Sequence, residues 1–221
     1  MSERRDPPIL DPPIRLVVCV SGAGTTLQNL IDQIEDGRLN AEIVQVVASK
    51  PGIEAIPRAD RAGIPCLVVK KGGRTVSEFS AEVFEPIRRQ RGELVIMGGF
   101  LPLIDIPGDY ETRVFNVHPS LVPAFCGKGF HGEAVHRAAI AMGVKVSGCT
   151  VHIADASYDT GPIILQEAVP VLDDDTPATL AARVFEAECR ALPEAIRLYA
   201  NGRLHLEGRR VLKQSPNPSP R

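Results

Sequence analysis

Short apolar runs rich in β-branched residues alternate along the first half of this chain with segments of helical period. Leu27, Leu30, Ile31 and Ile34, for example, recur at the spacing that places side chains on one face of a helix. Buried strands separated by helices form a parallel sheet through right-handed crossovers. The pattern therefore predicts an α/β fold with a Rossmann-like, mostly parallel central sheet and helices on both faces. The expected strands are 14–20, 43–48, 65–69 and 94–97, and the expected helices lie at about 27–34, 53–62 and 76–91.

The second half of the chain does not show the same regular alternation of strands and helices. The expected elements are a strand at 114–117, an alanine-rich helix at 132–142, and two strand-like runs at 145–154 and 162–171. These two runs are expected to pair antiparallel. A last long helix begins at Thr176-Pro177, where an N-cap residue precedes proline at the first helical position, and Asn201-Gly202 ends it. Pro193 is expected to kink this helix, and Pro86 to kink or shorten the helix at 76–91, because proline removes a helical hydrogen bond.

The chain shows no internal repeat and no linker inside its core, so we expect one domain over 14–207. The proline-rich segment 1–13 is expected to be a disordered tail, and the polar segment 208–221 a flexible one. A formal net charge of −2 indicates no basic surface for nucleic acid. No apolar run approaches the roughly 18 residues of a membrane helix. We therefore expect neither nucleic acid nor membrane as a partner.

Five cysteines are scattered along the chain without a C-x-x-C pair. This dispersion indicates a reducing, cytoplasmic compartment and argues against both a disulfide framework and a zinc cluster. Cys126 and Cys149 have no base at a readable spacing, so we expect ordinary thiols rather than nucleophiles. The acidic run 173–175 directly precedes a helix start, where carboxylates favour the helix dipole. No metal site is expected.

A glycine-rich loop, Ser21-Gly22-Ala23-Gly24-Thr25-Thr26, joins the first expected strand to the first expected helix. A helix N-terminus offers unpaired N–H groups and the positive end of the helix dipole, and glycine lets the backbone approach an anion. The hydroxyls of Thr25 and Thr26 add donors. No lysine follows as in a P-loop, and residue 27 is Leu rather than the third glycine of a dinucleotide site. The loop predicts a site for one terminal phosphate; a tight turn that simply needs glycine is the alternative.

Asn116 and His118 lie two residues apart on the strand expected at 114–117, so their side chains share one face. An amide and an imidazole side by side at a strand end can stabilise an oxyanion and transfer a proton during acyl transfer. Pro119 forces the chain to turn there, which would expose the pair in a cleft. The alternative is a polar turn with no catalytic role.

Asp159 lies in a turn-rich loop, 157–162, between the two strand-like runs. It can be a turn former and nothing more. If the loop folds against His118, the negative charge of Asp159 would raise the pKa of the imidazole and favour its charged form. His152, which alternates with apolar neighbours, is expected in the core or behind the site residues rather than as a ligand.

Taken in order, these motifs resemble the glycinamide ribonucleotide formyltransferases. The resemblance runs from about residue 14 to 204 and rests on Ser-Gly-x-Gly-Thr at 21–25, Gly-Gly-Phe at 98–100, Asn-x-His-Pro-Ser at 116–120 and Asp-Thr-Gly-Pro at 159–162. It implies the formyltransferase fold and an enzyme of de novo purine biosynthesis, cytoplasmic and monomeric or homodimeric. The implied reaction moves the formyl group of 10-formyltetrahydrofolate, a co-substrate, to the amine of glycinamide ribonucleotide.

The resemblance also implies three sets of site residues. The catalytic set is Asn116, His118 and Asp159, in which the amide and a charged imidazole stabilise the oxyanion while the carboxylate keeps the imidazole protonated. The ribonucleotide set is Gly24, Thr25, Thr26 and Glu188. The folate set is Arg74, Leu101, Pro102, Leu103 and Ile104, together with Asn116.

The chain departs from the family pattern at several positions. Thr26 stands where Asn is usual, and Leu101-Pro102 stands where the family commonly has Met-Arg, which removes a positive charge. The stretch 124–132 is longer than usual and is expected to be a surface loop near the cleft. Three rivals share the fold. A formyltetrahydrofolate deformylase would carry an extra N-terminal domain, and a methionyl-tRNA formyltransferase a C-terminal domain and a basic surface. A non-catalytic nucleotide-binding module would not need all three catalytic residues.

Overall fold

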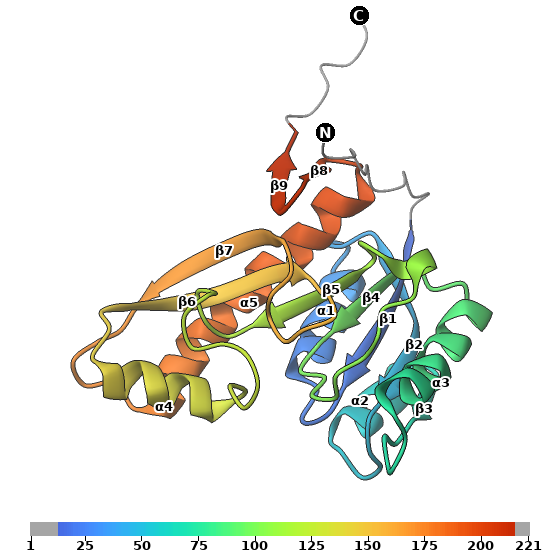
Figure 1. Ribbon diagram of the computed structural model, residues 1–221, viewed down its shortest axis with the longest axis horizontal. Coiled ribbons are helices and arrows are strands. Elements are labelled where there is room, and N and C mark those ends of the chain that lie inside the picture. The colour runs from blue at the N-terminus through green and yellow to red at the C-terminus, as the bar shows by residue number, and fades with distance from the viewer. Residues whose placement is uncertain (1–12, 215–221) are drawn as a thin grey trace, which may run out of the picture.

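In the computed structural model, which describes residues 13–214, seven strands form one twisted sheet with helices on both faces (Figure 1). The strand order is β3-β2-β1-β4-β5-β6-β7. The strands are β1 (Ile14–Val20), β2 (Ala41–Ala48), β3 (Cys66–Val68), β4 (Leu94–Met97), β5 (Val114–His118), β6 (Val146–Ile153) and β7 (Ile163–Pro170). β1 to β5 pair in parallel, whereas β6 and β7 are antiparallel. The expected fold class is confirmed.

The helices are α1 (Thr25–Glu35), α2 (Ala55–Arg61), α3 (Val76–Arg89), α4 (Glu133–Met142) and α5 (Pro177–Ala200), with a short 3-10 helix, η1, at Gly108–Tyr110. Side chains alternate along β1, so this strand contributes apolar residues to a core on each side of the sheet. Leu16 and Val18 join the core that packs under α1 and α5, whereas Val17 and Cys19 join the core under α3.

Neither internal proline ends its helix. α3 continues three residues beyond Pro86 to Arg89, and α5 remains helical through Pro193 to Ala200. A proline removes only its own N–H from the ladder, and buried neighbours on both sides hold each helix against the sheet. The early end considered for α3 is therefore wrong.

Residues 208–213, expected to belong to a flexible tail, form the turn and second strand of a hairpin. β8 (Leu204–Glu207) pairs antiparallel with β9 (Arg210–Lys213) through the two-residue turn Gly208-Arg209 (Figure 1). Buried Leu204 gives the hairpin an apolar attachment, and Gly208, at φ 60, suits the left-handed turn position. Residues 1–12 and 215–221, where the remainder of both expected tails falls, lie outside the described residues. No helix within residues 13–214 is long and apolar enough to cross a membrane.

Parallel strands bring the loops at their carboxyl ends to one edge of the sheet. The chain leaves β1 toward β2 on one side, whereas β4 lies on the other, so a crevice opens between the loops after β1 and β4. Open α/β sheets bind ligands at such a switch in strand order. Strand β5, whose last residue is His118, ends at the same edge.

Candidate active site

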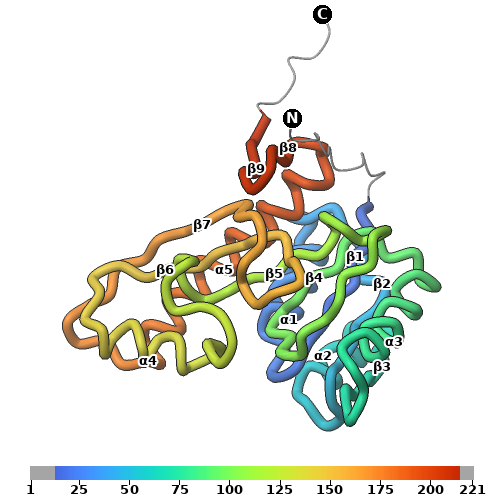
Figure 2. The backbone as a smooth tube through the Cα atoms, viewed as in Figure 1, coloured from blue at the N-terminus to red at the C-terminus, as the bar shows by residue number. Residues whose placement is uncertain are grey.

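A cleft of about 750 Å³ opens at this edge of the sheet. The loops that follow β1, β4, β5 and β6 line it together with one face of α5, and Figure 2 shows their backbones converging beside α1. Ala178, Ala181, Phe185 and Glu188, spaced three or four residues apart, form the α5 wall. The cleft thus brings together residues that lie between Ser21 and Glu188 in the sequence.

The glycine loop, residues 21–26, forms one end of the cleft. Gly24 caps α1 with a left-handed φ of 72°, and a Cβ placed on it would lie 2.6 Å from the Cβ of Ala55. Only glycine fits this approach of the loop to α2. Thr25 is exposed at the first position of α1, whose first turn holds no acidic residue. The positive end of the α1 dipole is therefore open to an anion.

Thr26 is buried in the cleft wall beside Gly98, where an added Cβ would lie 3.2 Å from the threonine Cβ. Ser21 bridges the glycine loop and the loop after β4. Its Oγ accepts hydrogen bonds from Ser49 Oγ at 2.7 Å and from the backbone N–H of Leu101 at 3.0 Å. Ser21 thereby connects the glycine loop to the segment 101–104 that follows β4. Leu101 to Ile104 all line the cleft, as the folate assignment requires.

Asn116, His152 and Asp159 meet at the base of the cleft. Asn116 Nδ2 donates to Asp159 Oδ1 at 3.0 Å and lies 3.0 Å from His152 Nε2. His152 Nδ1 lies 3.0 Å from the carbonyl oxygen of Ile153, which only accepts, so Nδ1 carries the proton and Nε2 of the neutral ring accepts from Asn116. Both amide hydrogens of Asn116 are therefore engaged by protein acceptors. A formyl oxygen must displace one of these two acceptors.

His118 presents one nitrogen to the protein backbone and the other to Asp159. Its Nε2 donates to the carbonyl oxygen of Phe125 at 2.9 Å. Its Nδ1 lies 3.5 Å from Asp159 Oδ2, beyond a good hydrogen bond, so Nδ1 is the atom that titrates. Burial lowers the pKa of His118 overall, although the charge of Asp159 and the bond to Phe125 raise it. The expected influence of Asp159 is present, but desolvation outweighs it.

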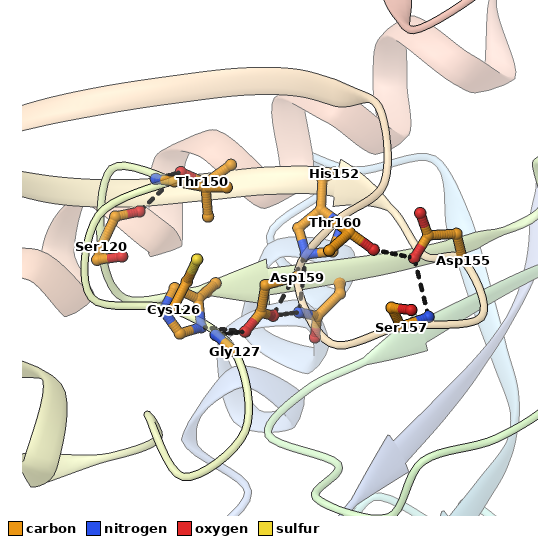
Figure 3. A network of polar contacts seen from close by, with 12 residues as sticks. Ser120, Cys126, Gly127, Thr150, His152, Asp155, Ser157, Asp159 and Thr160 are labelled. Carbon is orange, nitrogen blue, oxygen red and sulfur yellow. Dashed lines mark hydrogen bonds and ion pairs between the residues drawn. The ribbon is translucent and has the colours of Figure 1, made fainter.

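The Asp159 carboxylate is held in a strained turn (Figure 3). Asp159 has a left-handed φ of 56°, and Oδ2 accepts the backbone N–H of Gly127 at 2.8 Å. The loop is braced by Asp155, whose Oδ1 accepts from Ser157 N at 3.1 Å and Thr160 Oγ1 at 2.6 Å. Burial opposes ionisation of Asp159, yet the neighbouring imidazoles of His152 and His118 and the hydrogen bond from Gly127 together lower its pKa.

Of the two remaining assigned residues, Glu188 lines the cleft and Arg74 does not. Glu188 lines the α5 wall of the cleft, and burial raises the pKa of its carboxyl to about 8. Arg74, by contrast, is not among the residues that line the cleft. Its guanidinium pairs with Glu82 at 2.7 Å and donates to the carbonyl oxygen of Lys70 at 2.8 Å, so the structure does not bring it to the other site residues.

The sequence analysis did not identify several cleft residues. His136 on α4 is buried against the cleft, and its Nδ1 has no hydrogen-bond partner among residues 13–214. Tyr158, Phe130 and Lys128 also line the cleft. The stretch 124–132, expected only to be near the cleft, supplies part of its wall. The available signal was its three glycines, since Gly127, Gly129 and Gly132 all have positive φ angles that allow the backbone to fold inward.

The cysteines and the acidic run behave as structural groups. Burial raises the pKa of Cys126, and raises that of Cys149 to about 12, so neither thiol is activated as a nucleophile. Asp175 binds Arg183 and the N–H of Leu172 just before α5 begins. Residues 13–214 hold no group of three histidine, cysteine or acidic side chains placed to bind a metal ion.

This cleft agrees with comparison to known proteins. Residues 14–196 match the formyl transferase family, which is most of the chain. The chain belongs to the formyl transferase family. A member of this family from Vigna unguiculata, "Phosphoribosylglycinamide formyltransferase, chloroplastic", is 33% identical over 210 residues, which are 93% of this chain and 67% of the relative.

Other formyl transferase relatives differ in length. "Trifunctional purine biosynthetic protein adenosine-3" of Gallus gallus is 41% identical over 194 residues, but these are 86% of this chain and only 19% of the relative. The chain therefore spans about a fifth of that protein. Among solved structures, glycinamide ribonucleotide transformylase 1 from Symbiobacterium toebii has a TM-score of 0.85 and 40% identity, covering 91% of this chain and 94% of the other. A formyltetrahydrofolate deformylase from Pseudomonas syringae, at 21% identity and a TM-score of 0.81, shares the fold.

Proposed function

We propose that this protein transfers the formyl group of 10-formyltetrahydrofolate to the amine of glycinamide ribonucleotide, giving N-formylglycinamide ribonucleotide in de novo purine biosynthesis. The observation that carries the proposal is the grouping of Asn116, His118 and Asp159 at the base of a cleft whose end is an open helix N-terminus. An acyl-transfer centre and an anion site in one cleft suit a phosphorylated amine substrate.

Each part of the two substrates has a complementary part of the cleft. The phosphate binds the backbone of Gly24 and the hydroxyls of Thr25 and Thr26 at the start of α1, and Glu188 faces the ribose. The flat rings of the folate lie against Leu101 to Ile104 and the exposed rings of Phe130 and Tyr158. Arg74 is left out of the proposed folate site.

The proposed reaction begins with a neutral imidazole rather than a charged one. The substrate amine attacks the formyl carbon, the new C–N bond forms, and the carbonyl pair moves to the oxygen. Asn116 turns an amide hydrogen from Asp159 to this oxyanion, a contribution typically of roughly 10²–10³ in rate. His118 Nδ1 takes the proton of the attacking amine, and nearby Asp159 stabilises the resulting charge. The oxyanion pair then returns to form the new formyl C=O bond as the C–N10 bond breaks, and His118 Nδ1 gives its proton to N10 of the folate.

The test measures loss of the formyl group from 10-formyltetrahydrofolate with and without glycinamide ribonucleotide. We expect turnover only with the ribonucleotide, and a fall of roughly 10² or more in kcat for His118→Ala. Lys145→Ala, which alters an exposed lysine outside the cleft, is the control and should retain activity. Turnover without the ribonucleotide would identify a deformylase. Binding of the ribonucleotide without any turnover would identify a non-catalytic module.

The wider setting of the protein follows from the same proposal. Its partners are the two small-molecule substrates, and we infer a cytoplasmic protein, monomeric or homodimeric. All five cysteines are free, which suits a reducing compartment.

A further inference from the structure

Acidic side chains outnumber lysines and arginines in the lining of the cleft, although both proposed substrates are negatively charged. Among the described residues that line it, the acidic side chains are Glu133, Asp155, Asp159 and Glu188, whereas Lys128 is the only lysine or arginine. Both proposed substrates are anions: one carries a phosphate, and the other carries the carboxylates of its glutamate tail. A cleft of this composition needs a local positive charge wherever an anionic group must rest.

The phosphate already has a complementary site at the start of α1, where N–H groups and the helix dipole favour an anion. The carboxylates of the folate have none on the lip formed by Leu101 to Ile104, because all four of those side chains are apolar. Arg74 is engaged with Glu82 outside the cleft. Lys128 is therefore the positive charge left for the tail.

Local geometry holds Lys128 at the mouth of the cleft. The N–H of Phe130 donates to the carbonyl oxygen of Gly127 at 3.0 Å, which closes a tight turn with Lys128 and Gly129 at its centre. Gly129 has a φ of 92°, as the third residue of a type II turn requires. The N–H of Gly127 is bound to Asp159 at 2.8 Å, so the turn is fixed beside the catalytic carboxylate.

The ammonium group of Lys128 is free to bind a ligand. Lys128 is exposed, and no acceptor within residues 13–214 engages its side chain. The turn also brings Phe130, an exposed ring that lines the cleft, to the same wall. An aromatic surface followed by a cation at the rim matches the order of an aminobenzoyl ring followed by glutamate carboxylates.

We infer that Lys128 is a specificity-determining residue that binds the glutamate carboxylates of the folate co-substrate at the rim of the cleft; this inference rests on the proposed function. The pair is solvent-exposed, so the interaction is modest and weakens with salt. The loss of Lys128 affects the affinity for the folate and leaves the chemistry at His118 intact.

The experiment compares KM for 10-formyltetrahydrofolate and for its pteroate analogue, which lacks glutamate, in the wild type, Lys128→Ala, Lys128→Glu and Lys128→Arg. Lys128→Ala should raise KM for the glutamyl substrate roughly 2–5-fold, Lys128→Glu should raise it more, and Lys128→Arg should restore it. We expect kcat, KM for the ribonucleotide and KM for the pteroate analogue to stay constant. Lys145→Ala is the matched control, because Lys145 is an exposed lysine that pairs with Asp173 outside the cleft.

Three outcomes would overturn the inference. A rise in KM for the ribonucleotide instead would assign Lys128 to the phosphate. An equal rise for the pteroate analogue would mean that the substitution merely disturbs the turn, and no rise at all would mean that Lys128 binds neither anion. If the wild type lacks transferase activity, the proposed function fails separately. Calorimetric binding of the two folates to the same variants then decides the role of Lys128.

Discussion

At the scale of single residues, the chemistry of the site depends on which polar atoms are already hydrogen-bonded within the protein. The N–H on Nε2 of His118 is committed to Phe125, which leaves Nδ1 to exchange protons beside Asp159. Burial lowers the pKa of His118 below its usual value near 6.5, so the ring is mostly neutral at neutral pH and can accept the proton of the attacking amine. We expect kcat/KM to fall as pH drops through this lowered pKa.

Asp159→Asn tests this electrostatic balance. The charge of Asp159 raises the pKa of His118, so its removal should lower that pKa further and extend the neutral form to more acidic pH. An NMR titration of the imidazole measures the pKa, with His118→Asn used to assign the signal. A higher pKa for His118 in Asp159→Asn would contradict the proposed arrangement.

At the scale of elements, the C-terminal hairpin supports the loop that carries Asp159. Arg209, in the turn between β8 and β9, donates to the backbone carbonyl of Thr160, the residue next to Asp159. Arg209→Ala should release this side of the loop and lower kcat/KM about 2–5-fold, since one such bond contributes about 1 kcal/mol. Arg210→Ala, one residue along and equally exposed, is the control. Equal kinetics for both variants would mean that the hairpin does not position Asp159.

Strands and helices could be predicted from the sequence where burial of one face requires apolar residues at regular spacing. The parallel strands and the helices between them were predicted to within a few residues, because their apolar side chains must alternate or recur in register with the core. The β8–β9 hairpin was missed because it buries little apart from Leu204 and His205, so its pattern resembles a polar tail. The extent of α5 was predicted correctly, and the early end considered for α3 at Pro86 was wrong because packing against the sheet outweighs one lost hydrogen bond.

At the scale of the whole molecule, the site is a product of sheet topology. Asn116 lies opposite His152 in the β5–β6 register, and the loop beyond β6 then returns Asp159 to the same point. The motifs identified the side chains, but nothing local in the sequence sets a distance across 43 residues. The same reason explains why Arg74 was assigned to a cleft that it does not line, and why Lys128 was not assigned.

Glu188 links the stability of the whole molecule to the site. Burial raises the pKa of its carboxyl to about 8 in the folded protein, whereas in the unfolded chain it is about 4.3. Between these values the folded state holds a proton that the unfolded state has lost, so the contribution of Glu188 to stability falls as pH rises.

The variant Glu188→Gln removes this dependence of stability on pH. Relative to wild type, the variant should gain about 2 kcal/mol in free energy of unfolding between pH 5 and pH 8, a value reduced because solvent reaches this half-buried carboxyl. Urea unfolding at both pH values measures the change, with the exposed neighbour Glu186→Gln as control. A constant difference between Glu188→Gln and wild type at the two pH values would mean that the carboxyl is ionised in the folded protein. The same variant should bind the ribonucleotide more weakly, because the carboxyl that destabilises the folded protein is the one proposed to face the ribose.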